Sequence, residues 1–143
     1  MIDISEKDII LRTAKASGKI YLKEETIERI KNNQVKKGDA LTIAKISAIN
    51  AVKKVPDLIP LCHQIPITQV SVDFEFVEKN CIKTICIVKS FARTGVEMEA
   101  LTGANVALLN LWDVVKMYEK DDFGQYPSTI ITDIKVDEKI KEG

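Results

Sequence analysis

Hydrophobic and polar residues alternate most clearly in two neighbouring segments near the middle of the chain. In residues 70–77, valine and phenylalanine alternate with serine, aspartate and glutamate, which is the period-two pattern of a strand with one buried face. The polar residues Glu78, Lys79 and Asn80 separate this segment from a second run, at 82–91, that is rich in β-branched residues. The two segments therefore predict an antiparallel hairpin.

A helical period dominates two other segments. Apolar residues recur at helical spacing over 40–54, directly after Asp39, whose carboxylate is placed to cap the first turn. From Val96 to about Tyr118 an alanine and leucine stripe is accompanied by large apolar residues on the other faces, so we expect this helix to be buried nearly all round. A shorter helix is predicted at 23–31.

The remaining segments complete an α+β pattern. Residues 9–23 and 129–136 predict two further strands, while the charged tail 137–143 is expected to fray. Three prolines make 57–66 an ordered loop that cannot be helical. Because strands follow strands without a βαβ repeat, we expect residues 1–143 to form a single domain, with a mostly antiparallel sheet and helices packed on one of its faces.

Composition and charge exclude several classes of protein. With 45% hydrophobic and 29% charged residues the chain is an ordinary globular protein. The 21 basic residues balance 21 acidic ones, so we expect binding neither to nucleic acid nor to an anionic membrane. Three cysteines without a disulfide framework, no apolar leader and no bilayer-spanning run favour a cytoplasmic location.

The most apolar helix carries a charged pair. Asp113 and Lys116 are spaced so that both project from one face of that helix. A solvated ion pair on the helix surface is the commoner reason for such a spacing. Burial would instead make the pair suited to proton transfer, and we expect that setting here because the helix is so apolar.

A loop histidine and a helix start supply further candidates. His63 is the only histidine, and although a packed imidazole is the commoner role, imidazole exchanges protons near neutral pH. Its neighbour Cys62 is best explained as a small buried residue rather than a zinc ligand, since the other cysteines lack C-x-x-C spacing. Glu97 and Glu99 lie at the start of the long helix, where the helix dipole stabilises carboxylates, so a capping role explains them as well as a chemical one does. Lys37 is placed to meet an anion before the helix at 40–54, although a solvated lysine is the commoner role.

Four strings agree with one known family in order and spacing: Lys37-Gly-Asp39, Asp57-Leu-Ile-Pro-Leu-Cys-His63, Thr94-Gly-Val-Glu-Met-Glu-Ala-Leu-Thr102 and Asp113-x-x-Lys116. From Met1 to about residue 120 the chain closely resembles the cyclic pyranopterin monophosphate synthase family, protein C of molybdenum cofactor biosynthesis. The resemblance implies a ferredoxin-like subunit in a homohexamer, a trimer of dimers, with active sites between subunits. It also implies a lyase that converts (8S)-3′,8-cyclo-7,8-dihydroguanosine 5′-triphosphate to cyclic pyranopterin monophosphate and releases pyrophosphate.

The same resemblance implies roles for individual residues. The catalytic candidates are Asp113, Lys116, Lys37 and His63. The substrate-binding candidates are Leu61, Cys62, His63, Glu97, Met98, Glu99, Lys7 and Arg12. We expect a buried Lys116 to be the main proton shuttle, oriented by Asp113, and Lys37 and Arg12 to hold phosphates. No metal-ligand cluster and no required cofactor are expected, although Mg²⁺ can accompany the triphosphate. The glycine-rich tail of many family members is absent, with Lys139 as the candidate counterpart of its first lysine.

Two other classes of function remain open at this point. A ferredoxin-like module that binds a nucleotide without catalysis predicts tight binding and no release of pyrophosphate. The presence together of His63, Asp113 and Lys116 favours an enzyme over such a module. A structural metalloprotein is the third alternative, to be tested by metal content after chelation.

Overall fold

Eight helices and strands follow one another in the computed structural model, which describes residues 1–143. They are β1 (Ile10–Tyr21), α1 (Glu24–Lys31), α2 (Ala40–Val52), α3 (Val55–Leu58), β2 (Gln69–Val77), β3 (Cys81–Ala92), α4 (Glu97–Glu119) and β4 (Ile130–Glu142). The strands form one antiparallel sheet in the order β2-β3-β1-β4. This architecture confirms the α+β prediction and is consistent with a ferredoxin-like fold.

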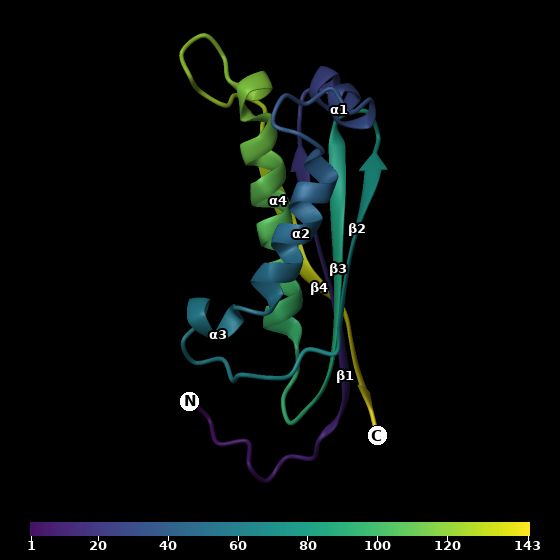
Figure 1. Cartoon of the computed structure of the whole chain (residues 1–143), viewed down its shortest axis with the longest axis vertical. Helices are drawn as coiled ribbons and strands as arrows, with labels where there is room; N and C mark the ends of the chain where they lie inside the picture. The colour runs from purple at the N-terminus through teal and green to yellow at the C-terminus, as the bar shows by residue number, and fades with distance from the viewer.

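The two long helices, α2 and α4, lie side by side over one face of the sheet (Figure 1). Small residues line the contact between them, and Ala44, Ala48, Ala104 and Ala107 have no solvent exposure. Small side chains allow the helix axes to approach closely, and the larger residues Leu108 and Leu111 fill the space toward the sheet. The predicted position of the helices on one face is therefore confirmed.

The hairpin predicted from the alternating pattern is formed by β2 and β3. Val72 lies opposite Cys86, and both are buried. The three cysteines are free thiols, and Cys81 and Cys86 are buried. No helix, α4 included, is both long and apolar enough to cross a bilayer.

Two boundaries differ from the prediction. The segment expected to be wholly non-helical begins inside the single helical turn α3, because Pro56 occupies a first-turn position where no backbone N–H is needed. The tail expected to fray instead continues β4 as far as Glu142. It does so because it pairs with β1, with Ile140 opposite Thr13 and Glu142 opposite Leu11.

The prediction that α4 is buried nearly all round holds only in part, because Leu101, Val106 and Trp112 are partly buried whereas one stripe of the helix is exposed. Its inner face packs on the sheet and on α2, but Leu109 is 59% exposed and Met117 is also exposed. The sequence pattern fails here because large apolar residues stand on a face that no other part of this chain covers.

The C-terminal end of α4 is fixed by a buried carboxylate that the sequence analysis did not single out. Glu119 has no solvent exposure and accepts hydrogen bonds from the backbone N–H of Lys23 at 3.1 Å and from the hydroxyl of Thr129 at 2.7 Å. The hydroxyl of Thr26 also donates to it. Glu119 therefore joins α4 to the start of α1 and to the segment before β4.

Candidate active site

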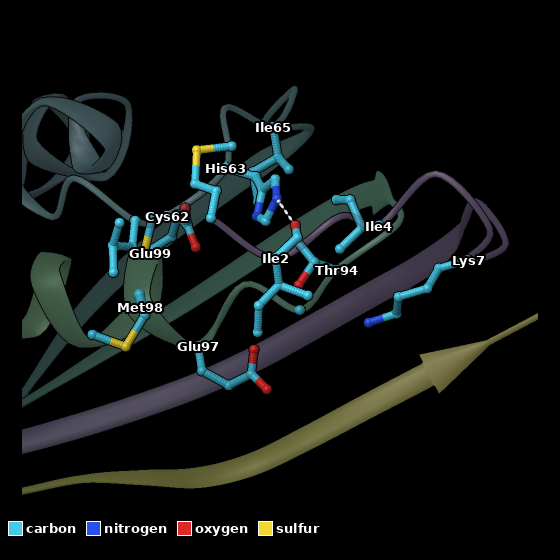
Figure 2. Close-up of a pocket in the computed structure, with 13 residues that line it drawn as sticks. Ile2, Ile4, Lys7, Cys62, His63, Ile65, Thr94, Glu97, Met98 and Glu99 are labelled. Carbon is cyan, nitrogen blue, oxygen red and sulfur yellow. Dashed lines mark hydrogen bonds between the residues drawn. The ribbon is translucent and has the colours of Figure 1, made fainter.

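A cavity of about 710 Å³ lies at the N-terminal end of α4. Its walls come from the loop after α3, the first turn of α4 and the N-terminal segment that precedes β1 (Figure 2). Seven of the predicted binding residues line it: Lys7, Leu61, Cys62, His63, Glu97, Met98 and Glu99. The structure thus brings together residues that are far apart in the sequence, in a cavity of a size typical for small ligands.

The N-terminal segment is held across this cavity by two side chains. His63 donates a hydrogen bond from Nε2 to the carbonyl of Ile2 at 2.7 Å (Figure 2). Arg93 donates from Nη1 to the carbonyls of Ser5 at 3.0 Å and Lys7 at 2.6 Å. Only Lys7 of this segment was predicted to bind substrate, because isolated backbone carbonyls and apolar residues leave no recognisable sequence signal.

The two carboxyl groups at the start of α4 have opposite electrostatic settings. Glu99 is 4% exposed, and its burial, together with the negative charge of Glu97, raises its pKa. Burial also acts to raise the pKa of Glu97, but a hydrogen bond from Lys139 Nζ at 2.5 Å and the charges of Lys139 and Arg12 outweigh it and lower the pKa. The carboxyl of Glu99 therefore binds a proton more tightly than that of Glu97 does.

Glycine at position 95 leaves room for the carboxylate of Glu97 in its present position. A Cβ atom there would collide with the carboxylate of Glu97, which folds back over the turn before α4. Any other residue there would move this flexible side chain, whereas the backbone angle of Gly95 is not one that requires glycine.

Arg12 and Cys62 differ from their predicted environments. Arg12 is buried, donates from Nε to the carbonyl of Ala92 at 2.9 Å and does not line the cavity, although its charge acts on Glu97. Cys62 lines the cavity and is only partly buried, so the expectation of a small buried residue holds only in part. Burial and the nearby Glu99 raise the pKa of Cys62, which keeps it a thiol.

The other catalytic candidates form a separate cluster, which we call the lysine cluster: Lys37, Asp113 and Lys116. Lys116 Nζ lies 3.1 Å from Oδ1 of Asp113, and Lys37 Nζ lies 3.2 Å from Oδ2. The hydrogen bond from Lys116 and then that from Lys37 lower the pKa of Asp113. The spacing prediction that Asp113 and Lys116 meet is therefore confirmed, and Lys37 joins them from the turn before α2.

The predicted burial of this pair is wrong for the single chain. The side chain of Asp113 is 57% exposed and that of Lys116 is 41% exposed. They stand on the outer face of α4, which no other element of the chain covers. A buried proton shuttle is thus not present within one subunit.

The cavity adjoins the first turn of α4, whereas the lysine cluster lies near the C-terminal end of the same helix. Asp113 follows Glu97 by more than four helical turns, which corresponds to about 24 Å along the axis. One chain therefore does not bring His63 together with Asp113 and Lys116, although each half of the predicted site is assembled.

Replacing Glu99 with glutamine is expected to raise the melting temperature by about 2–4 °C near neutral pH and to have little effect near pH 4. A carboxyl whose pKa in the folded protein is raised above its ordinary 4.5 binds its proton more tightly in the folded state. Its contribution to stability is therefore full below pH 4.5 and is lost as pH rises from 4.5 through the folded pKa. Glutamine has no charge to bury and removes this cost. Thermal unfolding at both pH values measures the difference.

Glu97 provides the matched control with the opposite sign. Its pKa is lowered, so it contributes stability above the ordinary 4.5 that is lost as pH falls through the folded pKa. Glutamine at position 97 is therefore expected to lower the melting temperature near neutral pH. The difference in melting temperature between this variant and the unsubstituted protein is expected to become smaller in acid. Shifts of the same sign for both variants would contradict the opposite settings of the two carboxyls.

No group of three or more His, Cys, Asp or Glu side chains is arranged to hold a metal ion.

The sequence is similar over nearly its whole length to a known protein family. A family model described as MoaC family matches residues 1–142.

Three relatives illustrate the similarity, and all carry the name probable cyclic pyranopterin monophosphate synthase. The protein from Methanococcoides burtonii is 57% identical over 142 residues, which cover 99% of this chain and 89% of the relative. The protein from Thermococcus kodakarensis is 54% identical, over 99% of this chain and 90% of the relative. The protein from Archaeoglobus fulgidus is 53% identical, over 100% of this chain and 91% of the relative.

Proposed function

The chain belongs to the MoaC family, and from this membership we propose that it converts (8S)-3′,8-cyclo-7,8-dihydroguanosine 5′-triphosphate to cyclic pyranopterin monophosphate in molybdenum cofactor biosynthesis. The reaction is that of a lyase, in which pyrophosphate leaves. The observation that carries the proposal is the cavity in which His63, Glu97 and Glu99 meet. A non-catalytic nucleotide-binding module is less favoured, because the similar proteins carry the name of a synthase.

The substrate's charge indicates that the cavity is only part of the site. A triphosphate needs several cations around it. Lys7 is the single cationic side chain on the cavity wall, while Lys37 and Lys116 are exposed at the other end of α4. We propose that the cavity of one subunit faces the lysine cluster of another, so that the phosphates lie between them.

A site shared between subunits requires a homo-oligomer. The apolar outer side chains Leu109 of α4 and Ile46 of α2 are both more than half exposed in the single chain, which supports contact with another subunit. We propose a hexamer built as a trimer of dimers, in which this contact would also bury the lysine cluster.

The groups in this composite site suit the two parts of the reaction. Ring rearrangement needs proton donors and acceptors, and we assign the main proton transfer to Lys116, oriented by Asp113. Glu99 is suited to donate a proton and Glu97 to stay ionised, from the opposite shifts in their pKa values. Closing the cyclic phosphate needs a hydroxyl oxygen to attack the α-phosphorus as pyrophosphate departs, and Lys37 would hold the departing phosphates.

The remaining expectations follow from the same proposal. We expect the chain to act in the cytoplasm on a small-molecule substrate, without nucleic acid or membrane as a partner. We expect no resident cofactor, with Mg²⁺ entering as part of the triphosphate substrate. Arg12 would then act through its charge on Glu97 rather than by touching phosphate, since it is buried and does not line the cavity.

Incubation of the purified protein with the cyclised triphosphate tests the proposal. Pyrophosphate and the pterin product are expected to appear in equal amounts. Binding of the triphosphate without release of pyrophosphate would instead identify a non-catalytic module. Failure to bind it at all would remove the proposed substrate.

A further inference from the structure

Tyr118, near the C-terminal end of α4, contacts the turn that carries Lys37. The turn joins α1 to α2 and has no regular secondary structure. The hydroxyl of Tyr118 accepts a hydrogen bond from the backbone N–H of Lys36 at 2.9 Å. The residue directly before Lys37 is therefore attached to the helix that carries Asp113.

Apart from this hydrogen bond, the backbone of the turn is held by the residues at its start and its end, Val35 and Gly38. Val35 is buried before it, and Gly38 after it has a φ of +126° and donates its N–H to the carbonyl of Val35 at 3.1 Å. Residues with side chains rarely adopt that backbone angle, so glycine sets the direction in which the chain leaves Lys37. The bond to Tyr118 fixes the distance of the turn from α4.

Tyr118 is itself held in place from α1. The guanidinium of Arg29 lies 4.5 Å from the centre of its ring, and Lys23 Nζ donates to its backbone carbonyl at 3.2 Å. The next residue is the buried Glu119, which joins α4 to α1. The ring therefore has a fixed position from which its hydroxyl can hold the turn.

An exposed lysine loses conformational freedom when it is held in one geometry, and exposed ion pairs are weak for that reason. Lys37 nevertheless donates both to the carbonyl of Asp113 at 3.0 Å and to its carboxylate at 3.2 Å. We propose that Tyr118 is a positioning residue, whose hydroxyl holds the turn so that the ammonium of Lys37 stays in the lysine cluster. The functional part of this inference rests on the proposed role of that cluster.

The substitution Tyr118→Phe tests the inference, because it removes the hydroxyl and keeps the ring over which Arg29 stacks. One hydrogen bond of this kind corresponds to a loss in kcat/KM of about three- to tenfold. The same substitution in a Lys37→Ala background is expected to cause no further loss. The matched control is Tyr21→Phe, since Tyr21 lies in β1, opposite Cys81 of β3, and outside the turn and the lysine cluster.

A second measurement does not depend on catalysis. Lys37 helps to lower the pKa of Asp113, so Tyr118→Phe is expected to raise the pKa of Asp113 in an NMR titration, no further than Lys37→Ala does. Tyr21→Phe is expected to leave it unchanged. If Tyr118 contributed only to the general stability of the fold, Tyr118→Phe would not shift the pKa of Asp113 in a protein whose melting temperature is unchanged.

Each result decides the inference. An unchanged Asp113 titration in Tyr118→Phe overturns it, as does a loss of kcat/KM that is equally large with and without Lys37. Undiminished turnover in Tyr118→Phe overturns it as well. If the unsubstituted protein forms no product, the proposed function fails, and the Asp113 titration alone then confirms or rejects the contact through which Tyr118 acts.

Discussion

Alanine in place of Lys116 is expected to abolish formation of pyrophosphate and pterin while the protein stays folded. A positioned group that transfers a proton in the rate-limiting step contributes about 10²–10⁴-fold to the rate. Lys116 is the candidate for that group because its ammonium lies 3.1 Å from Asp113, which orients it. Steady-state assays of both products, with a thermal unfolding curve for each variant, measure the two parts of the expectation.

The chain contains a closely matched control for this substitution. Lys31 pairs with Glu28 at the same spacing of three residues, and its side chain is 39% exposed against 41% for Lys116. Removal of either exposed ammonium is expected to change the free energy of unfolding by less than about 0.5 kcal/mol. Lys31→Ala should retain full turnover, and equal turnover in Lys116→Ala would remove Lys116 from the mechanism.

Much of the fold follows from local patterns in the sequence. The alternation at 70–77 and the helical period at 40–54 each reflect one buried face, so both elements were predicted almost to their ends. The length of β4 was not predicted, because its charged residues are held by pairing with β1 at the other end of the chain. Such long-range pairing leaves no local pattern to recognise.

The cavity and the lysine cluster were predicted to different extents. Through the family resemblance, one sequence string predicted three residues that line the cavity, which are Glu97, Met98 and Glu99. The pattern also indicated burial of Asp113, and this was wrong because apolar residues such as Leu109 can face another subunit as well as a core. The contact between Tyr118 and Lys36 joins distant segments through a backbone N–H, which no residue type reveals.

Mixing two inactive variants is expected to restore activity if the site is shared between subunits. His63→Ala damages the cavity, and Lys116→Ala damages the lysine cluster at the far end of α4. In a mixed dimer with a two-fold axis, one of the two sites would combine the intact cavity of one subunit with the intact cluster of the other. An equal mixture, after subunit exchange, should therefore recover about a quarter of the normal turnover.

The control for this experiment uses two variants damaged in the same half of the site. Lys116→Ala mixed with Asp113→Ala should recover nothing, because every lysine cluster in the mixture then lacks one member, whichever subunits meet. Native mass spectrometry establishes that mixed oligomers have formed in both experiments. If mixed oligomers of His63→Ala and Lys116→Ala are present and remain inactive, the cavity of one subunit does not work with the lysine cluster of another. The proton-transfer role assigned to Lys116 would then have no substrate within reach, because about 26–28 Å of helix separates it from the cavity residues Glu99 and Glu97 of its own chain.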